Sequence, residues 1–303
     1  MTPTHTLAAA EVDTDRIGAI TAGAPHAIGR DFTARHFSEE MFFGRMDPLL
    51  MVDHFVMTGP TFAPHPHAGM SAVTLMFEDA QGGFFNRDTL GKQFTLRAGD
   101  LYWLAAAGGA AHEEVPEPGA RTHALQIFVN LPPRLKHGPA HSLLVRADDI
   151  PVIENEAHRV RVVLGRSGET VGATGTPEPF TLLDVTLKPG GLFAHPLSAD
   201  EGAWLYVVSG TVTLRSRDDA QAIGEGRATT VRAGEEGFLH LEAEADTPAH
   251  AVLMAATPIR ETFVKHGPVV MSTMADARRA LIDYADGRFG ELPVALPSVN
   301  TAR

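Results

Sequence analysis

Short apolar runs, each bounded by turn-forming residues, repeat along almost the whole chain from Pro48 onward. Runs of this length that are rich in β-branched and aromatic residues predict strands, and a regular series of them is typical of a sandwich or barrel. The first set reads LLMVDHFVM, SAVTLMF, QFTLRAGDLYWLA and HALQIFVNLP, and the second reads FTLLDVTLKPGG, WLYVVSGTVTL, ATTVRAGEEGFLHL and HAVLMAATP. With 29 glycines and 21 prolines to supply turns, the pattern predicts an all-β protein.

The two sets of strands predict two barrels in one chain. A length of 303 residues is enough for two packed domains, each with its own core. We therefore expect an N-terminal domain at 1–135, a connection at 136–175 and a C-terminal domain at 176–303. The turn segments LRAGDL (96–101) and VRAGEEG (231–237) follow apolar strands in the two halves. Their similarity suggests an internal duplication, with the two turns at comparable places.

The two ends of the chain carry different signals. Residues 1–40 show no clear periodicity, and we expect them to join or cover the first barrel. In the segment MADARRALIDYADGRFG, by contrast, Ala277, Leu281 and Tyr284 recur at helical spacing, and Gly287 marks a stop. The sequence therefore predicts one short C-terminal helix.

Composition excludes several classes of site and partner. The chain has no cysteine, so disulfides, thiolate nucleophiles and Cys-bound metals are absent, and any metal must be held by His and carboxylates. A formal net charge of −12, without a run of Lys or Arg, argues against direct nucleic-acid binding. No leader-like N-terminus and no apolar run of about 20 residues is present, so we expect a cytoplasmic protein without a membrane segment.

Two pairs of potential metal ligands stand out. His65 and His67 are two residues apart, and so are His112 and Glu114. Residues i and i+2 of an extended strand point to the same face, so two strands can direct four ligands at one ion. A single HxH motif is weak evidence, because loop histidines and a solvated acidic turn give the same letters. The second pair, which follows a glycine-rich turn, favours the metal site.

The donor set limits the choice of metal. Three imidazoles and one carboxylate suit Fe(II), with Mn, Ni, Cu or Zn as alternatives. If the ion is six-coordinate, two positions stay open, which is typical of a catalytic or ligand-binding ion rather than a structural one.

Other histidines and aromatic residues receive simpler interpretations. His195 and His240 occupy places loosely comparable to the ligands of the first half. Leu197, two residues after His195, cannot bind a metal, and only His240 with Glu242 could form a ligand pair. We therefore expect no metal in the second half. His54 is expected to be a hydrogen-bonded core histidine. Histidines in turns or exposed strands need no function: His123, His137, His141 and His158. Trp103 and Phe128 fit the core. An apolar mouth above the metal is expected from four residues, namely Phe62, Met70, Phe84 and Phe85.

Several motifs resemble a known family. Gly59, five residues and then His65-x-His67 is similar to the first cupin signature, and Gly109-x-x-His112 resembles the second. The sequence is similar to the pirin family over about residues 45–290. The similar segments are DHF (53–55), HPHAGM (65–70), GDLYWLAAAGGAAHEEVP (99–116), LQIFVNLP (125–132), HGPVVMST (266–273) and DYADGRFG (283–290). The resemblance implies a bicupin with two jelly-roll barrels. It also implies one iron ion in the first barrel, held by His65, His67, His112 and Glu114.

The chain departs from the family pattern beside these ligands. Pirin sequences usually read HPHRGFE at the first pair, whereas Ala68, Met70 and Ser71 replace the Arg, Phe and Glu. Asn86, in NRDTLG, stands where relatives carry a His. These residues are expected to alter the surroundings that orient the ligands and tune the ion, and with them the substrate preference.

The resemblance implies a metal-dependent dioxygenase of the quercetinase type. The expected substrates are dioxygen and a small aromatic dihydroxy compound, such as a flavonol, that chelates the ion. Glu114 is expected to have a second, catalytic role, because a carboxylate can accept a proton from a substrate hydroxyl. The alternative is a regulatory protein that binds a protein partner according to the redox state of its metal. An open apolar mouth would favour the enzyme, and a metal buried beside a charged surface would favour the regulator.

Overall fold

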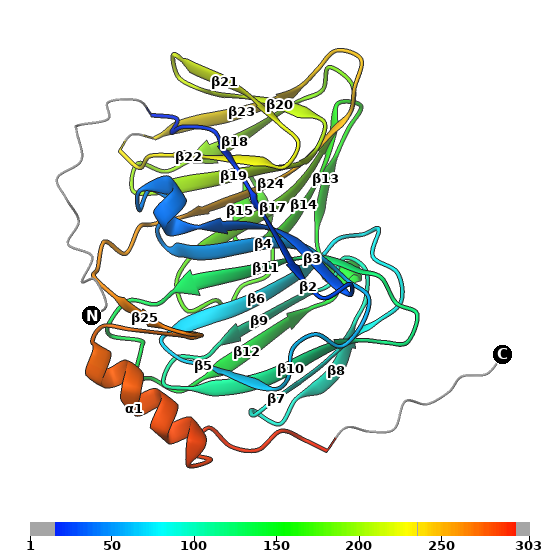
Figure 1. The fold of residues 1–303 in the computed structure, drawn as a ribbon. Helices are drawn as coiled ribbons and strands as arrows, with labels where there is room; N and C mark the ends of the chain where they lie inside the picture. Colours follow the sequence, from blue (N-terminus) through cyan, green and yellow to red (C-terminus); the bar gives the residue numbers. More distant parts are fainter. Residues whose placement is uncertain (1–15, 235, 295–303) are drawn as a thin grey trace.

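The computed structural model of this protein describes residues 16–234 and 236–294, which form two barrels packed against each other (Figure 1). Each barrel consists of a seven-stranded and a four-stranded sheet, and all strand pairs named below are antiparallel. The predicted all-β fold, built from two cupin barrels with a short C-terminal helix, is confirmed. Within the described ranges, no helix is long and apolar enough to cross a membrane.

The first barrel occupies the lower half of Figure 1. Its large sheet has the order β12 (His141–Val145), β9 (Leu101–Ala105), β6 (Met70–Met76), β11 (Thr122–Asn130), β4 (Leu49–Met57), β3 (Phe32–Ser38) and β2 (Ala24–Ile28). Its small sheet has the order β5 (His65–His67), β10 (Ala110–Pro116), β7 (Phe84–Asp88) and β8 (Gln93–Leu96).

The second barrel repeats this construction. Its large sheet has the order β1 (Thr21–Ala22), β22 (Arg227–Val231), β19 (Gly202–Ser209), β24 (Ala249–Ala256), β17 (Phe180–Leu187), β14 (His158–Leu164) and β13 (Val152–Glu154). Its small sheet has the order β18 (Leu192–Leu197), β23 (Gly237–Ala243), β20 (Thr211–Ser216) and β21 (Asp219–Gly224). The strands from β17 to β24 are therefore divided between the two sheets in the same sequence as β4 to β11, which is the expected duplication.

The two similar turn segments do not occupy equivalent places in this duplication. Residues 96–101 lie between β8 and β9, whereas residues 231–237 lie between β22 and β23. The counterpart of the first turn is the connection from β21 to β22, so the expected correspondence was wrong by one strand. The shared letters reflect the common chemistry of a tight turn after an apolar strand, which is not specific to one position.

Apolar side chains fill the space between the barrels and the inside of the second barrel, but only part of the first. The two large sheets bury Trp103, Phe180 and Trp204 between them, so Trp103 is a core residue as predicted. Aliphatic residues such as Val185 and Leu205 fill the second barrel. The first barrel holds a smaller cluster of mainly aromatic and Met residues, which leaves room for a hollow described below.

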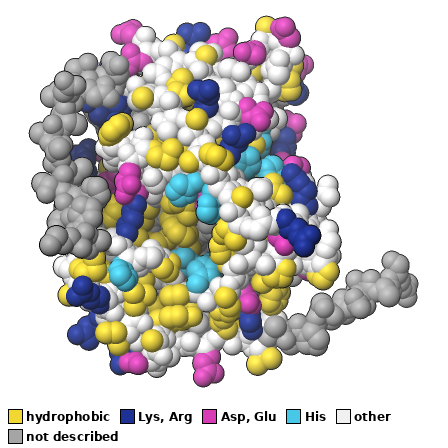
Figure 2. Space-filling model, viewed as in Figure 1, with side chains coloured by type: hydrophobic (Ala, Val, Ile, Leu, Met, Phe, Trp, Pro, Cys, Tyr) yellow, Lys and Arg dark blue, Asp and Glu magenta, His cyan; other side chains and the backbone are white. Residues whose placement is uncertain are grey.

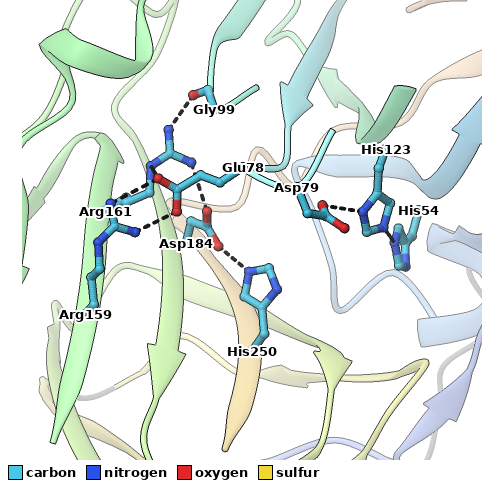
Figure 3. A network of polar contacts seen from close by, with 9 residues as sticks. All are labelled: His54, Glu78, Asp79, Gly99, His123, Arg159, Arg161, Asp184 and His250. Atoms are coloured by element: carbon cyan, nitrogen blue, oxygen red, sulfur yellow. Dashed lines mark hydrogen bonds and ion pairs between the residues drawn. The ribbon is translucent and has the colours of Figure 1, made fainter. Parts of the chain in front are cut away.

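A chain of polar contacts crosses the boundary between the barrels (Figure 3). His123 Nδ1 lies 2.6 Å from Asp79 Oδ1, the Nε2 atoms of His123 and His54 are 2.6 Å apart, and His54 Nδ1 is 2.5 Å from the hydroxyl of Tyr206. One arrangement satisfies all four groups: Tyr206 donates to His54, His54 donates to His123, and His123 donates to Asp79. Both imidazoles are then neutral. His54 is thus the hydrogen-bonded histidine that we expected, whereas His123 is a member of this chain and not an exposed residue.

Beside this chain, an ion cluster joins the same two barrels (Figure 3). The buried Asp184 accepts hydrogen bonds from Arg161, at 3.0 Å, and from His250 Nε2, at 2.5 Å. Burial acts to raise the pKa of Asp184, but His250 and Arg161 hold that pKa below its usual value. Arg159 binds both oxygens of Glu78 in the first barrel, at 2.6 and 3.0 Å. The large sheets therefore meet through charges as well as apolar side chains.

The ends of the described chain cross from one barrel to the other. Near the N-terminus, β1 pairs with β22 of the second barrel, and β2 and β3 extend the first. The expected connection at 136–175 also contains strands of both barrels, because β12 pairs with β9, and β13 with β14. After β24 the chain returns to the first barrel, where β25 (Val264–His266), β26 (Val269–Met271) and α1 (Met274–Ala285) lie (Figure 1).

We call residues 264–290 the C-terminal strap. Val270 N donates to Ala68 O at 2.9 Å, and the buried Lys136 Nζ donates to Gly69 O at 2.7 Å and to Val270 O at 2.9 Å. A Cβ atom added to Gly69 would lie 1.8 Å from Val270 O, so only glycine permits this approach. The helix begins after its N-cap Thr273 and ends at residue 285, as predicted. The strap thus holds the turn that follows β5.

Candidate metal centre

Three histidines from two paired strands converge at one point inside the first barrel. In the register of β5 and β10, His65 lies opposite His112 and His67 lies opposite Ala110. The three ring centroids are 4.8 to 5.0 Å apart, and one nitrogen from each ring lies within 4.8 Å of the other two. The i, i+2 spacing predicted this convergence, because alternate residues of a strand share a face.

Burial keeps these imidazoles neutral. His67 and His112 are almost fully buried, and desolvation lowers the pKa of His67 to about 3 and that of His112 well below its usual value. Desolvation also lowers the pKa of His65, against a hydrogen bond from its Nδ1 to Ala63 O at 2.9 Å. Neutral imidazole is the form that coordinates metal ions.

Glu114 lies beside the three histidines but outside their compact group. Its Oε2 atom is 4.0 Å from His112 Nδ1, and its Oε1 atom accepts a hydrogen bond from Thr74 Oγ1 at 2.8 Å. Burial raises the pKa of Glu114 to about 7, although the Thr74 hydrogen bond acts to lower it. A carboxylate with this pKa can gain or lose a proton near neutrality.

The residues present fit a divalent metal ion. His67 Nε2 and His112 Nε2 are 3.1 Å apart. Two imidazole nitrogens at normal metal distances on neighbouring coordination positions are separated by about 3 Å. His112 Nδ1 is buried without a hydrogen-bond partner among the described residues, so the cluster is not closed by internal hydrogen bonds. Neutral nitrogen donors next to a carboxylate suit the first-row metals named above.

An apolar hollow of about 200 Å³ leads to the histidines. Figure 2 shows it as a recess with hydrophobic side chains inside and histidines at its edge. The lining combines Phe and Met side chains with four histidines and three other polar residues: His26, Phe32, Met51, Asp53, Phe55, Met57, Phe62, His65, His67, Phe84, His112, Glu114, Gln126 and Phe128. The expected apolar mouth is therefore present.

The membership of this hollow differs in part from the prediction. Phe62 and Phe84 line it as expected, but Phe85 does not, because neighbours in β7 point to opposite faces. Met70 instead packs in a separate cluster with Val270 of the C-terminal strap. Phe128 was predicted to be a core residue, and this was wrong: it lines the hollow and its ring lies 5.2 Å from that of His67.

The sequence and its relatives agree on the family. The model of the Pirin family matches residues 23–129, and the model of the Pirin C-terminal cupin domain matches residues 182–290. The chain belongs to the pirin family. Pirin of Homo sapiens is 31% identical over 249 residues, which cover 81% of this chain and 83% of the relative. A protein of Pseudomonas aeruginosa that is provisionally named quercetin 2,3-dioxygenase is 35% identical over 257 residues, covering 80% and 87%.

Solved structures share the pirin fold. A quercetin 2,3-dioxygenase from Acinetobacter baumannii superimposes with a TM-score of 0.80 at 24% identity, over 91% of this chain and 98% of that chain. The bacterial pirin YhhW from Escherichia coli, solved in complex with nickel(II), gives a TM-score of 0.60 at 18% identity, over 79% and 100%. At these identities the structural likeness shows the fold alone.

The residues that depart from the usual pirin pattern lie around the site rather than in it. Ala68 and Met70 are buried under the C-terminal strap, and Ser71 is buried beside them on β6. Asn86 lies directly opposite Glu114 in the pairing of β7 with β10. Neither polar atom of its amide has a hydrogen-bond partner among the described residues. Of the four changes, the one at Asn86 is therefore the one paired directly with a proposed ligand on a neighbouring strand.

The second pirin barrel arranges its corresponding histidines differently. His195, in β18, points into the barrel and lies 3.0 Å from Ser167 Oγ. His240 and Glu242, in β23, are partly exposed, and His240 lies opposite Ala194 rather than His195. His195 and His240 thus occupy opposite faces of the small sheet. Of the remaining histidines, His137 and His141 are exposed as expected, whereas His158 is buried and hydrogen bonds to Leu192 O.

Proposed function

We propose that this chain is a metal-dependent dioxygenase of the quercetinase type, acting on a flavonol or related aromatic dihydroxy compound. The proposed ligands of its single ion are His65, His67, His112 and Glu114, and the proposed metal is Fe(II), with Mn, Ni, Cu and Zn as alternatives. The observation that carries the proposal is the open apolar hollow that ends at three neutral imidazoles. The provisional name of the Pseudomonas aeruginosa relative supports it.

The shape of the site favours an enzyme over a metal-responsive regulator. A regulator needs the ion only as a sensor, so no path for a small molecule is required. Here the hollow reaches the histidines from solvent, and flat aromatic side chains such as Phe32 and Phe128 form its walls. Such walls suit a planar aromatic ligand, because aromatic rings pack well face to edge and in offset stacks.

The residues of the chain have distinct proposed roles. The bound ion would supply the Lewis acidity and the one-electron chemistry that dioxygen requires. Glu114 accepts the proton of the substrate hydroxyl, and Thr74 fixes its orientation by the hydrogen bond at 2.8 Å. The aromatic wall excludes water from the reacting substrate.

The test compares dioxygen consumption with flavonol binding. Protein loaded with Fe(II) should consume dioxygen when quercetin is added, and Glu114→Gln should reduce turnover by about 100-fold or more while changing quercetin affinity much less, because an amide cannot accept the proton. An oxygen electrode and product analysis measure turnover, and fluorescence measures binding. The metal content of the variants must be matched.

Glu113→Gln is the matched control. Glu113 is the neighbour of Glu114 on β10 but points to the other face, where Arg87 Nε donates to its Oε2 at 2.6 Å. This variant should keep wild-type turnover. If iron-loaded wild-type protein consumes no dioxygen with quercetin beyond the level of free iron, the dioxygenase proposal is refuted.

A further inference from the structure

A row of polar side chains crosses the inner face of the large sheet of the first barrel. Thr74 on β6 lies opposite Gln126 on β11, Gln126 lies opposite Asp53 on β4, and Asp53 lies opposite His36 on β3. Residues directly opposite each other in a sheet point to the same face. Asp53 and Gln126 line the hollow, so the row forms a polar strip in an otherwise apolar wall.

At the end of this row nearest the histidines, the polar side chains hydrogen bond to one another and to Glu114. Thr74 Oγ1 lies 2.8 Å from Glu114 Oε1 and 3.2 Å from Gln126 Oε1, so its single proton serves these two acceptors. Gln126 Nε2 donates to Val73 O at 3.1 Å. Thr74 therefore orients Glu114 and has no proton left for a ligand, whereas Gln126 supports Thr74 and keeps one N–H of its amide beyond these bonds.

Asp53, farther along the row, can accept a further hydrogen bond. Its Oδ1 atom is 2.7 Å from His36 Nδ1, and no described residue hydrogen bonds its Oδ2 atom. The side chain is 15% exposed, and its neighbours on the same face of β4 are Met51 and Phe55, with Gln126 opposite it on β11. A carboxylate oxygen that faces apolar walls gains strongly from a hydroxyl donor, because such charge-assisted hydrogen bonds are stronger than neutral ones.

The spacing of the strands sets the size of the molecule that reaches both ends of the row. Neighbouring strands are about 4.8 Å apart, so Asp53, two strands from Thr74, lies about 10 Å from it along the sheet. Thr74 contacts Glu114, which marks the histidine end. A compound with more than one ring spans this length, with its chelating oxygens at the histidines and an outer ring beside Asp53.

We propose that Asp53 is a specificity-determining residue of the hollow, which selects polycyclic polyphenols by accepting a hydrogen bond from a hydroxyl on the ring farthest from the histidines. The same carboxylate disfavours a ligand with a carboxylate on that ring, because two like charges repel in a poorly solvated site. This inference rests on the proposed function and names the substrate class of that site. It also gives a role to the DHF segment: Asp53 and Phe55 face the hollow, and His54 faces the second barrel.

The test is equilibrium binding to protein loaded with Zn(II), which does not react with dioxygen. Three probes share the chelating group of a flavonol: quercetin, which has hydroxyls on both outer rings, 3-hydroxyflavone, which has none, and 4′-carboxy-3-hydroxyflavone. Wild-type protein should prefer quercetin to 3-hydroxyflavone by about tenfold or more, the range expected for a hydrogen bond to a charged group. It should bind the carboxylated probe more weakly than 3-hydroxyflavone.

Asp53→Leu should remove the preference for quercetin and leave the affinity for 3-hydroxyflavone unchanged or higher. Asp53→Asn keeps an acceptor without the charge, so it should retain part of the preference for quercetin and relieve the discrimination against the carboxylated probe. Glu113→Gln, which also removes a carboxylate but lies outside the hollow, is the matched control and should leave all three affinities at their wild-type values. Thermal unfolding and zinc content confirm that each variant is folded and loaded.

The two proposals fail in different ways. If wild-type protein binds the flavonols and Asp53→Leu leaves the ratio of their affinities unchanged, the role of Asp53 is refuted while the proposed function stands. Equal losses for quercetin and 3-hydroxyflavone in Asp53→Leu would likewise refute selective recognition. If zinc-loaded wild-type protein binds none of the three probes, both proposals are refuted.

Discussion

Acidification should weaken the contact between the barrels through His54. This residue is mostly buried and lies between Tyr206 and His123, where a neutral ring satisfies both neighbours. Desolvation, followed by the repulsion that a protonated His54 would meet from a protonated His123, lowers the pKa of His54 to about 3. In the unfolded chain the pKa returns to about 6.5, so the unfolded state binds a proton at pH 5 and the folded state does not.

The sign and the size of the effect follow from these two pKa values. A histidine with a lowered folded-state pKa contributes stability above the unfolded-state pKa, and that contribution is lost as the pH falls from about 6.5 towards about 3. Integrating the difference in bound protons from pH 8 to pH 5 gives a loss of about 2 kcal/mol in the free energy of unfolding from His54 alone.

The assay is urea unfolding of metal-free protein at pH 8 and pH 5, in wild type and in His54→Gln. Trp103 and Trp204 are both buried between the barrels, so their fluorescence reports on the contact that His54 joins. Glutamine cannot titrate, and the variant should lose about 2 kcal/mol less than wild type between the two pH values. His141→Gln, which removes an exposed histidine, should behave like wild type. Equal pH dependence in wild type and His54→Gln would refute the argument.

Two further predictions concern the metal centre. His67→Ala should abolish binding of the single metal ion expected per chain, because it removes one of three converging imidazoles, while His195→Ala should retain the ion. Elemental analysis measures the metal content of both variants, and loss of an ion from His195→Ala would contradict the assignment. Lys136→Met should lower the free energy of unfolding by about 2 kcal/mol or more, because Gly69 O, Val270 O and Asn130 Oδ1 lose their shared donor. The variant should also release the metal to a chelator faster than wild type, because Gly69 lies in the turn after β5. Release at the wild-type rate would show that the contact does not position β5.

The parts of the site that depend on local spacing were predictable from sequence. His65, His67 and His112 are brought together as expected, because an i, i+2 pair on a strand fixes which face both side chains share. The position of Glu114 as a fourth ligand stays a prediction. Apolar periodicity likewise indicated the strands and the C-terminal helix.

The wall of the hollow was harder to predict, because the central strands of the large sheet have apolar side chains on both faces. In β11, Gln126 and Phe128 face the hollow, whereas Leu125 and Ile127 face the second barrel. Large apolar side chains occur on both faces, so the sequence alone placed Phe128 in the core. A signal existed in β4, where every second residue lines the hollow, namely Met51, Asp53, Phe55 and Met57. This alternation can be used only when it is known which face of the strand points toward the three histidines, and only the tertiary fold shows that.

The C-terminal strap makes the metal centre depend on the order in which the chain is synthesised. The ligand strands lie within residues 65–116, but Val270 is translated more than 150 residues after them. Val270 N donates to Ala68 O, and Lys136 donates to the carbonyl oxygens of both Val270 and Gly69. While the ribosome is still making the second barrel, the turn after His67 lacks the support that it has in the finished protein. The contacts that hold this turn therefore form only after the strap has been synthesised, and a product truncated before residue 264 contains every proposed ligand without those contacts.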